Sequence, residues 1–225
     1  AFSSAEGLQI TFDYAAYGKW TSEDADGLSF FLIDGSTPPT LGSNFGYAAK
    51  VSTSAVTNGY VGIGLDAWGG CSALPCGVMD RVIVYGETRS SISHPTPMLT
   101  EVPLLGTAVG KIAPVDRPGR IVRITISPVS PAAPYPTVTV EIDPGSGFVK
   151  VIDAFSLAGN GPVPATFKMG FGASTGSHVD FHEVRIRSAK TLVSAVPALG
   201  QSTLGALALL LTLLTLPTLR SHFKN

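Results

Sequence analysis

The chain has 225 residues, of which 44% are hydrophobic and 14% charged, and its formal net charge at pH 7 is -1. Because the charges nearly balance, there is no basic field that would attract nucleic acid, and we exclude that class of partner. The apolar share is higher than a soluble domain usually carries, so part of the chain is expected in lipid or in a large interface. The 25 glycines and 17 prolines favour frequent turns, and therefore many short strands.

Strand signals begin close to the start of the chain. Residues 1–6 are expected to form a loop, and residues 8–14 alternate apolar and polar side chains, which is typical of a half-buried strand. Asp26 directly precedes an apolar run, which predicts a buried strand over 28–33 with a carboxylate at its entrance. An aspartate there either closes a turn by bonding its own backbone or accepts hydrogen bonds from an outside group, such as a sugar hydroxyl. The residues alone leave both interpretations open.

The remaining strands are predicted from the same period-two pattern. They cover residues 60–66, 81–85, 120–127, 137–143, 148–152, 165–171 and 180–187, and pairing is expected to resume over 47–52. The turn that follows Asp143 predicts a hairpin between the strands on either side of it. Prolines within 87–111 argue against a helix without defining a strand. Because no helical period precedes residue 195, the sequence predicts an antiparallel all-β sandwich over residues 1–188.

The two cysteines, Cys71 and Cys76, lie in one short segment. This pair alone offers too few ligands for a metal site. A disulfide that closes a small loop is the better interpretation, and it predicts an oxidising compartment.

The end of the chain differs in kind from the rest. After a linker over 189–196, residues 197–225 are predicted to form a hydrophobic helix with a short basic tail, long enough to cross a bilayer. Because Arg220 and Lys224 follow the apolar stretch, the C-terminus is expected in the cytoplasm and the sandwich outside. A buried core helix is the alternative. The first residues show no signal peptide, so we expect a mature or shortened chain.

Several of these segments together resemble the L-type (legume-like) lectins of the concanavalin A-like class, in a form found in bacterial surface proteins. The segments that carry the resemblance are 8–14, 26–32, 45–47, 61–66 and 168–176, and 182–184 is similar to the start of the family's closing strand. The resemblance implies a jelly-roll β-sandwich whose loops form a shallow sugar site. Family members usually carry strands before the one at residue 8, so the sandwich is expected to lack its first strands.

The resemblance also implies which residues would contact a sugar. Asp26 would accept hydrogen bonds from sugar hydroxyls, and the loop over 42–46 would offer backbone N–H groups at close range. The implied carbohydrate-binding residues are Asp26, Asn44, Gly46, Trp68, Thr175, Gly176 and Ser177, with the indole of Trp68 as a face for the sugar ring. The predicted function is therefore non-catalytic binding of a glycan or polysaccharide. A homo-oligomer would add avidity.

The sequence departs from the family at the metal site. Gly64 and Gly70 stand where the family has a metal-binding glutamate and a metal-binding asparagine. Calcium takes six to eight oxygen ligands, so no resident cofactor is expected, and Asp66 is the candidate ligand if Ca²⁺ does bind. These departures also favour the alternative function, a structural or adhesive surface protein that kept the sandwich without sugar affinity.

The C-terminal segment has its own resemblance. Val196-Pro197-Ala198-Leu199, a leucine-rich span and a basic end are similar to the sorting tails of Gram-negative surface proteins. That likeness implies export, with delivery to the bacterial cell envelope or the exterior. An ordinary single-span membrane anchor is the alternative.

Two clusters are candidate enzyme sites: an acidic pair, because glycoside hydrolases share this sandwich, and a histidine-containing group that could bind a metal or act in acid–base catalysis. Glu141 and Asp143 alternate along a strand, but no third acid follows in step, and a solvent-facing position beside a turn explains both. His178, Asp180 and His182 would share one face of a strand. The family resemblance makes that stretch an ordinary structural strand. We predict that the chain is not an enzyme.

The missing metal ligands lead to a first prediction. If the Cys71–Cys76 loop braces the segment around Trp68 in place of a metal, a reductant should lower the melting temperature and EDTA should not. Thermal unfolding followed with and without each reagent measures both effects. A melting temperature that falls with EDTA and not with the reductant would contradict this hypothesis.

Overall fold

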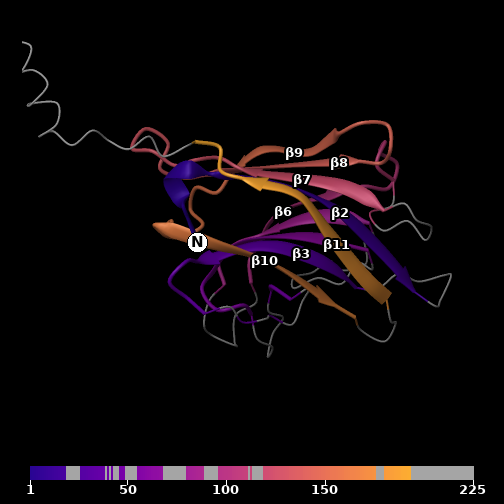
Figure 1. Ribbon diagram of the computed structural model, residues 1–225, viewed down its shortest axis with the longest axis horizontal. Helices are drawn as coiled ribbons and strands as arrows, with labels where there is room; N and C mark the ends of the chain where they lie inside the picture. The colour runs from indigo at the N-terminus through magenta and orange to yellow at the C-terminus, as the bar shows by residue number, and fades with distance from the viewer. Residues whose placement is uncertain are drawn as a thin grey trace, which may run out of the picture. The chain divides into compact units, whose positions relative to one another are not determined.

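Two antiparallel β-sheets pack face to face through their apolar sides in the computed structural model (Figure 1). The structure describes residues 1–18, 26–38, 40, 42, 46–48, 55–67, 80–88, 96–110, 112, 119–175 and 180–193. The compact unit to which they belong runs from Ala1 to Val193. The predicted antiparallel all-β sandwich is therefore confirmed for the described residues of this unit.

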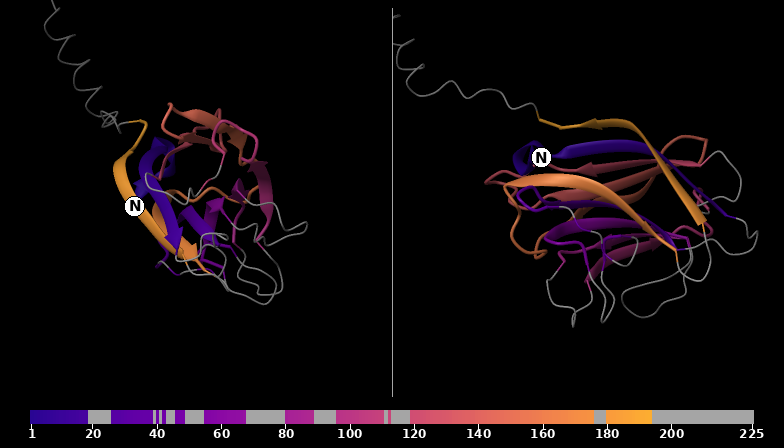
Figure 2. Two further views of the ribbon diagram at one scale, coloured as in Figure 1. Left: turned by 90° about the vertical axis from the view of Figure 1, so that its right-hand side faces the viewer. Right: turned by 60° about the horizontal axis from the view of Figure 1, so that its bottom comes forward.

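Within the described residues there are eleven strands and one short 3₁₀ helix. They are β1 (Phe2–Ser3), η1 (Ser4–Glu6), β2 (Leu8–Gly18), β3 (Gly27–Asp34), β4 (Gly59–Asp66), β5 (Arg81–Tyr85), β6 (Met98–Pro103), β7 (Arg120–Ile126), β8 (Thr137–Asp143), β9 (Val149–Ser156), β10 (Thr166–Ser174) and β11 (Asp180–Lys190). The six-stranded sheet has the order β1-β10-β3-β4-β5-β6, and the five-stranded sheet has the order β11-β2-β7-β8-β9. Strands β10 and β11, consecutive in the chain, run along the same side of the stack (Figure 2).

The alternating strands build the main core. In β7 and β8 every second side chain is buried, among them Val122, Ile124, Val140 and Ile142. Burying one such side chain stabilises the fold by about 1.5–3 kcal/mol, which is why the period-two pattern fixes which face each strand turns inward. The inner faces of β3, β4 and β5 complete this core with residues such as Phe30, Ile63 and Val84.

A second apolar cluster covers the outer face of the six-stranded sheet. Phe31, Ile33, Ile83 and Tyr85 pack there against Tyr47, Ala48 and Val56, with Met98 at the margin. Because β3, β4 and β5 are thus buried on both faces, their sequences are continuous apolar runs instead of alternating ones.

Tyr47 anchors the loop segment that lies on this outer face. A Cβ atom at Gly62 of β4 would overlap the Tyr47 ring, so only glycine lets the ring pack this closely onto the strand. The Tyr47 hydroxyl donates to the carbonyl oxygen of Gly86 at 2.8 Å. Burial raises the pKa of the Tyr47 hydroxyl well above its usual value, so it stays neutral and remains a donor.

Two segments differ from the sequence prediction. Residues 1–6 are not a plain loop, because β1 pairs with β10 and the Ser3 side chain caps the 3₁₀ helix that follows. The proline-containing segment 87–111, for which no strand was predicted, holds β6, which pairs with β5. Pro103 lies at the last position of this edge strand, where a missing N–H disturbs no further pairing.

The hairpin predicted around the turn after Asp143 is confirmed, since β8 and β9 pair antiparallel. Residues 194–225, which include the predicted hydrophobic helix, lie outside the described residues. Within the described ranges, no helix is long and apolar enough to cross a membrane.

The contact between Tyr47 and Gly62 leads to a second prediction. The substitution Gly62→Ala should lower the free energy of unfolding by about 1–3 kcal/mol, because the added methyl group displaces the Tyr47 ring. In a Tyr47→Ala background the ring is absent and the added methyl group has room. There, Gly62→Ala should lower the free energy of unfolding by less than half as much. Urea denaturation of the four proteins gives both numbers. Equal effects in the two backgrounds would show that the ring does not require the glycine.

Candidate functional site

Three strand ends meet at Asp26, the residue directly before β3. Its backbone N–H donates to the carbonyl oxygen of Ser174 on β10 at 3.0 Å, and its own carbonyl oxygen accepts from the N–H of Ala67 at 3.1 Å. The next residue, Gly27, is in register with both Ser174 and Asp66. Asp26 is thus fixed through its backbone to the ends of β10 and β4.

The carboxylate of Asp26 is positioned by one side chain. Ser174 Oγ donates to Asp26 Oδ2 at 3.1 Å, and the Asp26 side chain is half-buried. No residue in the described part of the chain donates to Oδ1. The carboxylate therefore joins two strands instead of closing a local turn, and one of its oxygens is available to an outside donor. Thr175, a predicted contact residue, follows directly and is exposed.

Gly46, another predicted contact residue, lies against the same strand as Ser174. Its φ is +79°, and a Cβ atom on it would lie 2.5 Å from the Cα atom of Gly172 on β10. Its carbonyl oxygen accepts from the N–H of Gly42 at 2.7 Å. A glycine is required here by both the backbone conformation and the close approach of two backbones. The structure thus brings Gly46 and Asp26 to one strand, β10.

Asp66, the predicted candidate metal ligand, is engaged by an arginine. Arg81 Nε donates to Asp66 Oδ2 at 2.9 Å, and both side chains have no exposed surface. Arg81 Nη1 donates to Glu101 Oε2 at 2.5 Å, and 29% of the Glu101 side chain is exposed. The carboxylate that a metal would need is therefore already paired with a positive charge.

The described residues around Asp66 do not fit a calcium ion. Gly64 offers no side-chain oxygen, and Asp80 Oδ1 accepts from the backbone N–H of Ile112 at 2.9 Å. No group of three or more His, Cys, Asp or Glu residues in the described ranges could hold a metal ion. A divalent ion at Asp66 would also be repelled by the guanidinium of Arg81.

The other predicted site residues cannot be placed. Asn44, Trp68, Gly176 and Ser177, and the cysteines Cys71 and Cys76, lie outside the described residues. Their roles in sugar contact and in a disulfide stay predictions.

The acidic pair weighed as a hydrolase site has other partners. Glu141 accepts from Arg123 Nη1 at 3.2 Å. Asp143 Oδ1 accepts from the N–H groups of Gly145 and Gly147, which hold the pKa of this carboxyl below its usual value. A general acid needs a raised pKa, so Asp143 is poorly suited to that role. The structure uses both acids to hold a strand pair and a turn.

The histidine cluster also has a structural explanation. His182 lies in β11, where its ring stacks on Tyr14 and Nδ1 lies 3.1 Å from the Tyr14 hydroxyl. His178 lies outside the described residues. The part of the predicted cluster that the structure describes is therefore packed against the neighbouring strand β2.

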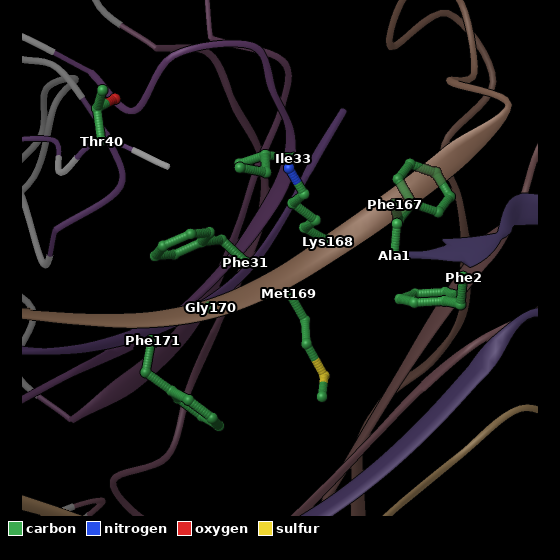
Figure 3. Close-up of a pocket in the computed structure, with 10 residues that line it drawn as sticks. All are labelled: Ala1, Phe2, Phe31, Ile33, Thr40, Phe167, Lys168, Met169, Gly170 and Phe171. Carbon is green, nitrogen blue, oxygen red and sulfur yellow. The ribbon is translucent and has the colours of Figure 1, made fainter. Parts of the chain in front are cut away.

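An apolar groove lies along β10, away from Asp26. Phe2, Phe31, Phe167, Met169 and Phe171 line it. Figure 3 shows the side chains of Met169 and Phe171 on one side of the β10 ribbon and that of Phe31, from β3, on the other. Its lining includes none of the predicted sugar contacts, and it is poor in the polar groups that sugar hydroxyls require.

The roles of Ser174 and Arg81 were not predicted from the sequence. Ser174 begins the turn over 174–178 that the family resemblance places at the sugar site, but nothing in the sequence signalled its hydrogen bond to Asp26. Arg81 and Asp66 did carry a signal, because one begins and the other ends an apolar strand. Opposite charges at those places are expected to face each other if the strands pair antiparallel.

The two stacked sheets and the cluster of strand ends define an L-type lectin fold. The chain is similar to the exoplasmic/lumenal domain of VIP36. Its Ca²⁺/Man₃GlcNAc-bound form matches with a TM-score of 0.55 and 15% identity, over 89% of this chain and 75% of that one. The metal-free form of that domain matches with a TM-score of 0.55 and 15% identity, over 85% and 72%. At this identity the likeness establishes the fold alone.

No protein-family model matches the chain, and no curated protein matches it significantly.

Proposed function

We propose that the chain binds carbohydrate without catalysis, at the end of the sandwich where Asp26 lies. The observation that carries this proposal is the Asp26 carboxylate, which is held by Ser174 and keeps one oxygen open to outside donors. A sugar hydroxyl that donates to an ionised carboxylate makes a hydrogen bond about twice as strong as one between neutral groups. The exposed Thr175 directly follows β10, and Gly46 packs against Gly172 of the same strand.

The similarity to VIP36 supports the same proposal at the level of the fold. The solved forms of that domain include complexes with Man and with Man₃GlcNAc. In this proposal Asn44, Trp68, Gly176 and Ser177 complete the contact surface, as the family resemblance implies. The partner is a glycan or polysaccharide, and Ca²⁺ is not required for its binding.

A structural or adhesive surface protein without sugar affinity is the second candidate. The observation that favours it is the engagement of Asp66 by Arg81, together with glycine at position 64. The two oxygen ligands that the family resemblance implies at positions 64 and 70 are absent, because both residues are glycine. Retention of the sandwich without those ligands would suit a domain that contacts other proteins.

We further propose that the domain is exported and associated with the bacterial cell envelope or exterior. The support is the sequence of residues 197–225, which fits either a sorting tail or a membrane anchor. A disulfide between Cys71 and Cys76 would agree with an oxidising compartment.

A third prediction tests the sugar site. Asp26→Ala should abolish retention of the protein on a glycan surface, a loss of roughly tenfold or more in affinity, because a charged hydrogen-bond acceptor is removed. The matched control is Asp153→Ala, which removes an exposed carboxylate from β9. A glycan array identifies the ligand first, and melting temperatures confirm that both variants are folded.

Two results would count against the proposal. Retention of Asp26→Ala equal to that of the control would remove Asp26 from the site. Binding of the unmodified protein to no glycan, even at high protein concentration, would favour the second candidate.

A fourth prediction concerns catalysis. Oligosaccharides incubated with the protein should release no reducing sugar above the rate of a buffer blank, because Glu141 and Asp143 are committed to Arg123 and to a turn. Release that disappears in a Glu141→Gln variant would identify a hydrolase instead.

A further inference from the structure

Asp66 and Arg81 form an ion pair that is buried on both sides, whereas each other ion pair between described residues has at least one partly exposed side chain. Neither side chain has exposed surface, and Arg81 Nε lies 2.9 Å from Asp66 Oδ2. Arg81 also donates from Nη1 to Glu101. Moving a single charge out of water costs several kcal/mol, so each of these groups depends on the other for its burial.

The pair is connected to Asp26 through the backbone of Ala67, the residue after Asp66. Asp66 is the last residue of β4 and Arg81 the first of β5, and the two are in register across the strands. Just beyond this pair, two backbone hydrogen bonds continue the strand pairing. The N–H of Asp80 donates to the carbonyl oxygen of Ala67 at 3.4 Å, and the N–H of Ala67 donates to the carbonyl oxygen of Asp26 at 3.1 Å. The ion pair therefore fixes the strand end to which the backbone of Asp26 is tied.

A divalent cation and Arg81 are alternatives at this position. A buried carboxylate at the end of β4 needs a positive partner, and either a guanidinium or a metal ion can supply it. Arg81 supplies it from the neighbouring strand, with two of its nitrogens on two carboxylates and no surface open to water. A metal ion that approached Asp66 would have to displace a charge-assisted hydrogen bond and remain beside a buried cation.

We propose that Arg81 is the resident cation of this site and that it makes the cluster of strand ends independent of divalent metal. Arg81 is a positioning residue: it holds Asp66, and through Ala67 it holds Asp26. Because Asp26 is the residue that contacts sugar in the proposed function, the functional part of this inference rests on that proposal. The structural part, a cluster stabilised by arginine instead of calcium, stands apart from any sugar.

The first arm of the test uses the unmodified full chain. Its melting temperature is measured in 5 mM CaCl₂ and in 5 mM EDTA, with a reductant present throughout so that no disulfide contributes. The two melting temperatures should agree to within about 1 °C, because a site that binds no ion gains no stability from one. A clear rise with calcium would overturn the inference, whatever the variants show.

The second arm uses variants. Arg81→Met removes the guanidinium from beside the buried Asp66 carboxylate and should lower the melting temperature by roughly 10 °C, whereas the matched Lys150→Met, at an exposed pair, should change it by no more than about 2 °C. Adding Asp66→Asn to Arg81→Met should recover part of the loss, because the buried negative charge that Arg81 balanced is then gone. If the decreases in melting temperature of Arg81→Met and of Asp66→Asn simply add in the double variant, the inference is overturned.

The third arm joins the pair to function. If the array finds a ligand, the unmodified protein should retain it equally in CaCl₂ and in EDTA. The Arg81→Lys variant should retain it more weakly, because a lysine ammonium lacks the planar guanidinium whose nitrogens donate to two carboxylates at once. Calcium-dependent retention would overturn the inference while leaving sugar binding intact. If the array finds no ligand, the proposed function fails, and the melting temperatures alone decide whether Arg81 replaces the metal.

Discussion

Backbone hydrogen bonds between the ends of β10, β3 and β4 are the constraint on which the candidate site depends. Asp26 donates to one neighbour and accepts from the other, so its position follows from strand pairing and not from its own side chain. A carboxylate whose backbone is already fixed in this way loses little further conformational entropy when a ligand binds. A site of this kind needs only one additional contact, the Ser174 hydroxyl, to fix the direction of the carboxylate.

The outer face of the six-stranded sheet changes character along the strands. In its middle, Phe31, Tyr47 and Tyr85 form an apolar cluster that holds the covering loop segment in place. At the end of the strands, Asp66 and Arg81 replace apolar packing with a buried ion pair. The buried ion pair therefore lies next to the packed apolar cluster on the same face of the sheet, and it is shielded from water and from salt.

The sequence predicted the strands far better than the site. Alternation identified the half-buried strands, and apolar runs bounded by glycine and aspartate identified β3, β4 and β5, because side-chain burial produces both patterns directly. The edge strand β6 was missed, since its six residues show no alternation of burial and lie among prolines. Asp26 was selected correctly as a residue at a strand entrance, but its tie to Ser174 depends on a pairing across 148 positions. The role of Arg81 was not predicted, because the register of β4 and β5 must be known before Arg81 can be placed opposite Asp66.

A map of glycan contacts tests the account most directly. Residues 1–193, labelled with ¹⁵N, would be titrated with the glycan that an array retains most strongly, and amide chemical shifts would be followed. The account predicts the largest changes at Asp26, Ala67, Ser174 and Thr175, which share one end of the sandwich. Changes confined to the opposite end of β3, at Ser36 and Thr37, would contradict it.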